Sequence, residues 1–133
     1  SAASDVYKRQ LPIQFTVIDH RLASSINNYH SNWNGYHVDF IAPIPMNDMP
    51  TFYSEQDVLI APSIWPESFG LVTREALSAG LWVIASDTGA LAEPILNTKD
   101  HNGFVIQPNN LDDLITALRD LPKVLKKKAD EEN

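Results

Sequence analysis

The residues best suited to chemistry lie between Pro62 and Gly80. Glu67 and Glu75 are eight positions apart, the first in a loop expected after a strand and the second in the helix expected next. A carboxylate accepts hydrogen bonds from paired hydroxyl groups, such as those of sugars and ribose, without acting as an acid or base. Alternatively, Glu75 pairs with Arg74 or another basic neighbour while Glu67 is solvated. Because its helix is largely apolar, we expect Glu75 to need a dedicated partner.

The same stretch offers a backbone site for an anion. Residues 68–71 lie where the loop turns into the helix, and the first N–H groups of a helix have no partner within it. Together with the helix dipole, these groups attract anions. Gly70 has no side chain and would let a phosphate or sugar approach closely. It could also serve only to permit a tight turn or close helix packing, so both interpretations stay open.

These residues need a scaffold of strands and helices. Apolar or alternating runs predict strands over residues 12–19, 37–42, 58–61, 81–86 and 104–107. Helices are predicted between and after them. This alternation predicts an α/β, Rossmann-like domain of three layers, with a parallel sheet of about five strands and helices on both faces. Ligands bind at the carboxyl ends of such strands, which here carry residues 19–20, 42–45, 62–70, 86–89 and 107–110.

One predicted helix covers the region before the second strand. Leu22, Ile26, Tyr29 and Trp33 recur at steps of four, three and four, which indicates one helical face that Gly35 ends. Residues 1–10 are expected to be a polar lead-in outside the fold, residues 11–121 the domain, and residues 122–133 a charged tail.

Capping residues predict two further helices. Asp48 is expected to cap a short helix with Phe52 and Tyr53 pointing inward. Asn110 is expected to cap the last helix, which Pro122 ends or kinks.

Composition excludes several classes of function. The 133 residues carry a net charge of −7 and a pI of about 4.8, which disfavours nucleic acid as a partner. No cysteine is present, which fits the cytoplasm. No apolar run reaches the length of about 18 residues typical of a membrane span. The four histidines lack metal-ligand spacing, so no metal site is expected.

Several motifs occur together in a particular order. They are Pro62-Ser63, then Glu67-Ser-Phe-Gly-Leu-Val-Thr-Arg-Glu75-Ala-Leu-Ser-Ala-Gly80, then Val83-Ile-Ala-Ser-Asp-Thr-Gly89 with Glu93, then Asn102-Gly103-Phe104. This series closely resembles the C-terminal half of retaining glycosyltransferases with the GT-B fold. These are the family-4, or group 1, enzymes with a Glu-x7-Glu signature, and the resemblance covers roughly residues 12–121.

The resemblance implies roles for individual residues. In the family this half binds a nucleotide-sugar donor, which is a substrate, so no cofactor or bound metal is expected. The implied donor-sugar and diphosphate contacts are Glu67, Ser68, Phe69, Gly70 and Leu71. Glu75 would hold the ribose hydroxyls, and the loop Ala42, Pro43, Ile44 and Pro45 would border the base. No residue of this half is assigned as catalytic. Glu93 matches a family position near the donor, although capping or packing of its own helix is an equal alternative.

The resemblance also implies that part of the enzyme lies outside this chain. The family's C-terminal half opens with a strand and helix whose Arg and Lys grip the diphosphate, and no such segment precedes Leu11. Ala42 and Asp19-His20 stand where the family usually has glycines. We therefore expect a fragment, inactive alone, of a hexosyl- or related transferase that builds bacterial-type surface polysaccharide or glycoconjugates.

The expected partners follow from that interpretation. They are the nucleotide-sugar donor and the missing N-terminal acceptor-binding domain, with the full-length enzyme in the cytoplasm or peripherally at the inner face of the membrane. Two other functions stay open: a non-catalytic nucleotide-sugar-binding or interaction module of the same fold, and a sugar-nucleotide epimerase. The context of the two glutamates favours a transferase over an epimerase.

Overall fold

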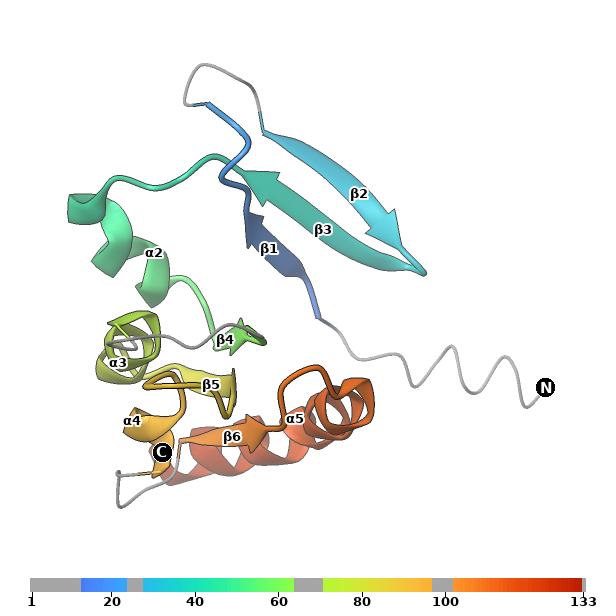
Figure 1. The fold of residues 1–133 in the computed structure, drawn as a ribbon, viewed down its shortest axis with the longest axis vertical. Helices are drawn as coiled ribbons and strands as arrows, with labels where there is room; N and C mark the ends of the chain where they lie inside the picture. Colours follow the sequence, from blue (N-terminus) through green and yellow to red (C-terminus); the bar gives the residue numbers. More distant parts are fainter. Residues whose placement is uncertain (1–12, 24–27, 64–70, 97–101, 133) are drawn as a thin grey trace. The chain divides into compact units, whose positions relative to one another are not determined.

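The computed structural model describes residues 13–23, 28–63, 71–96 and 102–132 (Figure 1). The chain divides into two compact units, residues 1–48 and residues 49–133. The first unit contains a mixed sheet of strands β1 to β3, and the second contains a parallel sheet of strands β4 to β6.

The mixed sheet has the order β1-β3-β2. Strand β1 (Phe15–Ile18) runs parallel to β3 (Tyr36–Ile41), whereas β2 (Tyr29–Trp33) and β3 form an antiparallel hairpin. Asn34 and Gly35 connect the hairpin with φ angles of 52° and 93°. Positive φ at both central residues characterises the type I′ turn, whose twist matches that of the flanking strands.

The prediction of one helix from Leu22 to Trp33 is wrong. Tyr29 and Trp33 lie in β2, and Ile26 lies outside the described residues. A separation of four places two residues on one face of a helix, but an even separation also places them on one face of a strand. The pair Asn34-Gly35, which is a strong hairpin signal, decides between the two.

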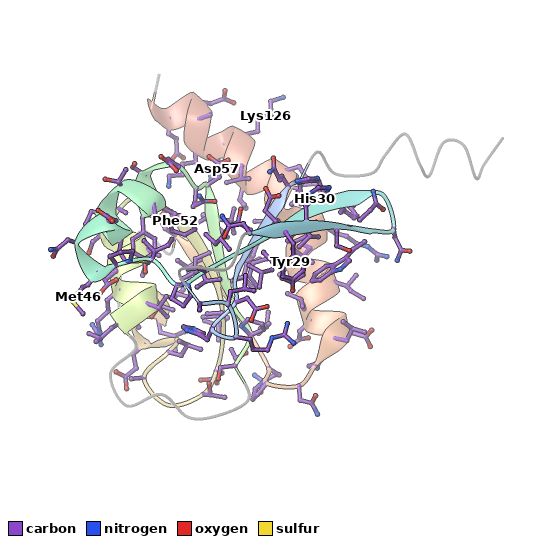
Figure 2. The ribbon with its side chains drawn as sticks, turned by 90° about the horizontal axis from the view of Figure 1, so that it is seen from above. Tyr29, His30, Met46, Phe52, Asp57 and Lys126 are labelled. Atoms are coloured by element: carbon purple, nitrogen blue, oxygen red, sulfur yellow. The ribbon has the colours of Figure 1, made fainter. Side chains whose placement is uncertain are left out.

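The two faces of the mixed sheet differ in chemistry. On one face, Tyr29 stacks on Phe40 with ring centroids 4.6 Å apart. On the other face, His30 stacks on His37 at 5.6 Å, and His37 Nε2 lies 2.7 Å from Asp39 Oδ1. Figure 2 labels Tyr29 and His30, neighbours in β2 that point to opposite sides of the hairpin.

The parallel sheet follows the order of the sequence, β4-β5-β6. Strands β4 (Val58–Ala61), β5 (Trp82–Ser86) and β6 (Gly103–Ile106) lie close to the predicted strands and pair in parallel. Every residue of the central strand β5 is buried. Strand β4, at the edge of this sheet, is half-buried throughout.

One face of the parallel sheet packs against short helices. They are α2 (Met49–Ser54), which follows the 3₁₀ turn η1 (Met46–Asp48), then α3 (Leu71–Ser78) and α4 (Glu93–Leu96). The buried residues of this core are Tyr53, Ala76, Leu81, Val83, Ala85, Leu91 and Ile95. Tyr53 is buried and Phe52 half-buried, so their predicted inward position is confirmed.

The last helix, α5 (Leu111–Glu132), begins as predicted. The backbone N–H of Asp113 donates to Asn110 Oδ1 at 3.0 Å, so Asn110 is the N-cap. In Figure 1, α5 lies beside β6. Within the described ranges, no helix is both long and apolar enough to cross a membrane.

Of the two predicted effects of Pro122, an end or a kink of the helix, the structure excludes the end. Helix α5 continues through Pro122 for ten further residues, although proline lacks the N–H that would bond to the preceding turn. Leu121 is buried and Leu125 half-buried, so apolar contacts continue past the proline. Lys128 Nζ also donates to the carbonyl oxygen of Gly80.

The α/β class is therefore confirmed, with helices packed on a parallel sheet. Each described sheet has three strands, fewer than the five expected in one sheet. The five predicted strands are present but are divided between two sheets, and in the first unit a tight hairpin adds β2 where a helix was predicted.

Candidate functional site

Helix α3 carries Glu75, and the end of this helix is well defined. Gly80 has a φ of 88°, the left-handed conformation that glycine adopts easily. Its N–H donates to the carbonyl of Leu77 at 3.0 Å, and the N–H of Leu81 donates to the carbonyl of Ala76 at 3.0 Å. This pair of hydrogen bonds is a Schellman motif, which satisfies the last carbonyls of the helix. The orientation of α3 on the parallel sheet is thereby fixed at its C-terminus.

Glu75 has a hydrogen-bond partner, but its carboxylate is exposed, so the burial from which a partner was predicted is not observed. The hydroxyl of Tyr53 donates to Glu75 Oε2 at 3.1 Å. Tyr53 is only 4% exposed, whereas Glu75 is exposed. Arg74, the alternative partner, instead approaches Glu93, with 3.6 Å between Nη2 and Oε2. The exposed carboxylate of Glu75 is therefore attached to the core through a buried phenol.

The phenol of Tyr53 stays protonated at neutral pH. Burial, and then the hydrogen bond to the Glu75 carboxylate, raise the pKa of Tyr53 from 10.0 to about 12. Both causes disfavour a phenolate beside a carboxylate. Tyr53 consequently acts as a fixed hydrogen-bond donor and not as a proton carrier.

A hollow of about 230 Å³ lies at the carboxyl edge of the parallel sheet. Its lining combines strand ends with the start of α5 and includes Pro62, Ser86, Ile106, Gln107, Asn110 and Leu114. Ser86 is 1% exposed, and its hydroxyl has no hydrogen-bond partner among the described residues. The structure thus brings together three of the segments predicted to share this edge.

Two hydrogen bonds hold the loops of this edge in place. Thr88 Oγ1 donates to the carbonyl oxygen of Ser63 at 3.5 Å and links the loops after β5 and β4. The backbone N–H of Gln107 donates to Asp113 Oδ2 at 2.9 Å and links the end of β6 to the first turn of α5. The loops are therefore joined to one another as well as to their strands.

In the first unit, Asp19 occupies the carboxyl end of β1. It is 7% exposed and accepts hydrogen bonds from Arg21 Nε at 2.9 Å and Nη2 at 2.8 Å. The Arg21 side chain and backbone hold the pKa of Asp19 well below its usual range. The glycosyltransferase family that the sequence resembles usually has glycine at this position. Here the ion pair of Asp19 and Arg21, with two hydrogen bonds between the side chains, occupies the carboxyl end of β1.

The loop Ala42–Pro45 follows β3 without regular structure, as its prolines predict. The N–H of Ala42 donates to Asn28 Oδ1 at 3.2 Å. The loop begins at the same edge of the mixed sheet as Asp19, whose N–H donates to the carbonyl of Ile41 at 2.8 Å. Its predicted role beside a base is not tested by these contacts.

The other predicted site residues divide into two groups. Glu67, Ser68, Phe69 and Gly70 lie outside the described residues. Leu71 is the first residue of α3, and its side chain is 62% exposed. Sequence reasoning missed the bond between Tyr53 and Glu75, although it placed Tyr53 inward and required a partner for the glutamate.

Curated proteins with similar sequences are mostly glycosyltransferases by name. A lipopolysaccharide core biosynthesis mannosyltransferase, LpsB of Rhizobium meliloti, is 33% identical over 70 residues, which is 53% of this chain and 20% of that protein. A D-inositol 3-phosphate glycosyltransferase of Corynebacterium kroppenstedtii is 37% identical over 84 residues, 63% of this chain and 18% of that protein. Spore coat protein SA of Bacillus subtilis is 39% identical over 70 residues, 53% of this chain and 18% of that protein.

The matched segments thus span about a fifth of each relative's length. A protein-family sequence model covers far more of this chain. The model described as "Glycosyl transferases group 1" matches residues 1–131. The chain therefore belongs to the group 1 glycosyl transferase family.

Proposed function

We propose that this chain forms the nucleotide-sugar-binding part of a retaining glycosyltransferase. Family membership supports sugar transfer and a Rossmann-like fold. The observation that carries the proposal is the position of Glu75, an exposed carboxylate on α3 with one oxygen bonded to buried Tyr53. A carboxylate held in this way suits two neighbouring hydroxyls of a ribose.

The proposed roles follow the family's motif. Glu75 accepts hydrogen bonds from the ribose, while Glu67 and Ser68 contact the donor sugar. The backbone at residues 69–71 meets the sugar and the diphosphate, whose charge is stabilised by helix N–H groups during transfer. Residues 42–45 border the base. No metal or cofactor takes part in this scheme.

The wider role belongs to a larger enzyme. The Rhizobium relative is named for lipopolysaccharide core biosynthesis, which supports a role in surface-glycan synthesis for this protein. The proposed partners are the nucleotide-sugar donor and an N-terminal acceptor-binding domain. The proposed location is the cytoplasm, with peripheral attachment to the membrane.

An NMR titration of the 133-residue chain tests the donor site. We expect UDP or GDP, or their sugar conjugates, to shift the amide signals of residues 69–75. Glu75→Ala should weaken that binding about tenfold or more, since a hydrogen bond to a charged group contributes roughly 1.5–3 kcal/mol. Glu131→Ala removes the same charge from an exposed position at the end of α5 and should leave the affinity unchanged.

Two results would contradict the proposal. One is the absence of any shift at residues 69–75 with saturating nucleotide. The other is an equal affinity of wild type and Glu75→Ala. The fragment's inactivity is tested separately, because sugar transfer by the isolated chain would show that the acceptor-binding domain is not required.

A further inference from the structure

We propose that Tyr53 is a positioning residue for Glu75, fixing the orientation in which this carboxylate meets a pair of neighbouring ligand hydroxyls. The inference rests on the proposed nucleotide-sugar site. It adds a residue that does not itself touch the ligand and that lies 22 positions before the glutamate on another helix.

The packing around Tyr53 leaves its ring little freedom. Tyr53 is 4% exposed and belongs to the core cluster with Ala76 and Leu81, which are 0% and 3% exposed. Its hydroxyl reaches the Glu75 carboxylate at 3.1 Å. The oxygen of the phenol is therefore a fixed point, and the flexible glutamate side chain is the partner that becomes ordered.

The contact leaves room for a ligand. An ionised carboxylate offers about four lone-pair sites on its two oxygens. Tyr53 uses one site on Oε2, and no described side chain donates to Oε1. One free oxygen and the remaining site on Oε2 can thus accept two hydroxyl hydrogens side by side. The 2′- and 3′-hydroxyls of a ribose have this arrangement.

A purely structural role would not need the hydroxyl. Phenylalanine would fill the same core space, whereas a buried hydroxyl is costly unless it is bonded. The hydroxyl at position 53 meets that requirement through the side chain of the proposed ribose-binding residue. Since the Tyr53 pKa is about 12, it donates this hydrogen bond throughout the physiological pH range.

If Tyr53 orders the Glu75 side chain before the ligand binds, the affinity for the ligand should be higher. A free glutamate side chain on a helix surface must lose rotamer freedom when it binds, and Tyr53 removes part of that cost before the ligand arrives. We expect Tyr53→Phe to weaken UDP binding about threefold to tenfold, the usual cost of ordering one long side chain. Tyr36→Phe removes a phenol hydroxyl from the first unit and should leave UDP binding unchanged.

Two comparisons separate positioning from a general loss of structure. Wild type should bind UDP more tightly than 2′,3′-dideoxyuridine diphosphate. Tyr53→Phe should reduce this preference without weakening the binding of the dideoxy compound. In a Glu75→Ala background, adding Tyr53→Phe should have no further effect on UDP affinity. If Tyr53→Phe lost the same affinity for UDP and for the dideoxy compound, the inference would be overturned. The same holds if the two substitutions weakened UDP binding independently in the double variant.

A ligand-free measurement tests the positioning directly. Three-bond couplings between the Hα and Hβ atoms of Glu75 should indicate one rotamer in wild type and averaged rotamers in Tyr53→Phe. Averaged couplings already present in wild type would overturn the inference, whether or not UDP binds.

The positioning role of Tyr53 and the donor site at Glu75 can be disproved separately. If Glu75→Ala weakens UDP binding and Tyr53→Phe folds but binds as wild type does, the positioning role is wrong while the donor site stands. If Glu75→Ala has no effect on UDP binding, the donor site itself is wrong.

Discussion

The two sheets of this protein have the same number of strands but are stabilised by different interactions. In the described part of the first unit, the buried residues are Val38 in β3 and Asp19, which follows β1. In the parallel sheet, all five residues of β5 are buried. The mixed sheet relies on ion pairs, polar contacts and aromatic stacking at its surface, whereas the parallel sheet relies on apolar packing beneath helices.

The comparison shows how the local connection decides the type of stabilisation. The parallel strands β4 and β5 are joined through α3, and this crossover helix also covers the sheet face. The antiparallel strands β2 and β3 are joined by two turn residues that cover nothing. Polar side chains such as Asp39 and His37 can therefore remain at the surface of the mixed sheet and pair there.

The largest expected contrast comes from the same substitution in both sheets. Ile84→Ala in β5 removes a side chain that is 0% exposed and leaves a cavity, which should lower the free energy of unfolding by about 2–5 kcal/mol. Ile18→Ala in β1 affects a half-buried side chain and should cost about 1 kcal/mol. Amide hydrogen exchange in β5 and in β3 measures each unit separately.

If Ile84→Ala and Ile18→Ala lowered the free energy of unfolding equally, the two sheets would be packed alike. In that case the distinction between an apolar core and a surface-stabilised sheet would have to be given up.

Gly103 tests how closely the parallel sheet is packed. A Cβ at this position would lie 2.3 Å from the carbonyl oxygen of Val83 and 3.2 Å from side-chain atoms of Ile95. Gly103→Ala should therefore destabilise the second unit by about 2–3 kcal/mol through overpacking. A Cβ at Gly80 would lie in open space, so Gly80→Ala should lower the free energy of unfolding only by the penalty of a positive φ, about 1–2 kcal/mol. Thermal unfolding of the two variants should rank them in this order, and the reverse order would contradict the packing argument.

Acid should act first on the mixed sheet. Hydrogen bonds from His37, and then from Gln14, hold the pKa of Asp39 below its ordinary value of 3.8. A carboxyl whose pKa is lower in the folded state stabilises the fold above its unfolded pKa, and this contribution disappears as the pH falls through the folded pKa. NMR signals of β2 and β3 should therefore weaken below about pH 4 before those of β5. Asp39→Asn should remove part of this pH dependence, and an unchanged dependence would exclude the residue as its source.

Alkali should act on the second unit, with a smaller effect. The pKa of Tyr53 is raised from 10.0 to about 12. A raised acid pKa means that stability is fully present below pH 10 and is lost as the pH rises through 12. Ultraviolet absorbance should show a late tyrosine titration near pH 12. That late titration should vanish in Tyr53→Phe, and its persistence would assign the shift to another residue.

The sequence predicted the parallel sheet well because its signals agree with one another. Val58–Ala61 and Trp82–Ser86 are short apolar runs bounded by polar or turn residues, and each is a strand in the structure. The cap at Asn110 was equally clear, since an amide side chain before two acidic residues favours a helix start.

The errors occurred where two signals competed. The spacing of Tyr29 and Trp33 fits a helix and a strand equally, and the turn at Asn34-Gly35 had to decide. At Pro122 the helix was predicted to end or to kink, and the end is excluded because the helix continues past the proline, with Leu121 buried and Leu125 half-buried. A local rule, the turn signal, decides the first case, whereas at Pro122 tertiary packing contributes the deciding energy.

The candidate site was predictable only in part. A partner for Glu75 was predicted from the apolar residues of its helix, but the identity of that partner was not. Tyr53 lies 22 residues earlier on a different helix, and nothing in local spacing links the two. Arg74, the neighbour in sequence, approaches Glu93 because that residue begins α4, a helix packed beside α3.

The strand order of the parallel sheet has a consequence for how the chain folds. Because β4, β5 and β6 are neighbours in the order in which they are synthesised, each new strand can add to the edge left by the previous one. Val58 pairs with Trp82 and Val83 with Gly103, so these pairings span 24 and 20 residues, about as many as the 23 between Phe15 in β1 and Val38 in β3. In the mixed sheet, β1 must instead wait for β3, which reaches it only after β2 has been made. During translation, we expect β1 to remain unpaired until the hairpin has emerged, whereas the second unit can assemble strand by strand.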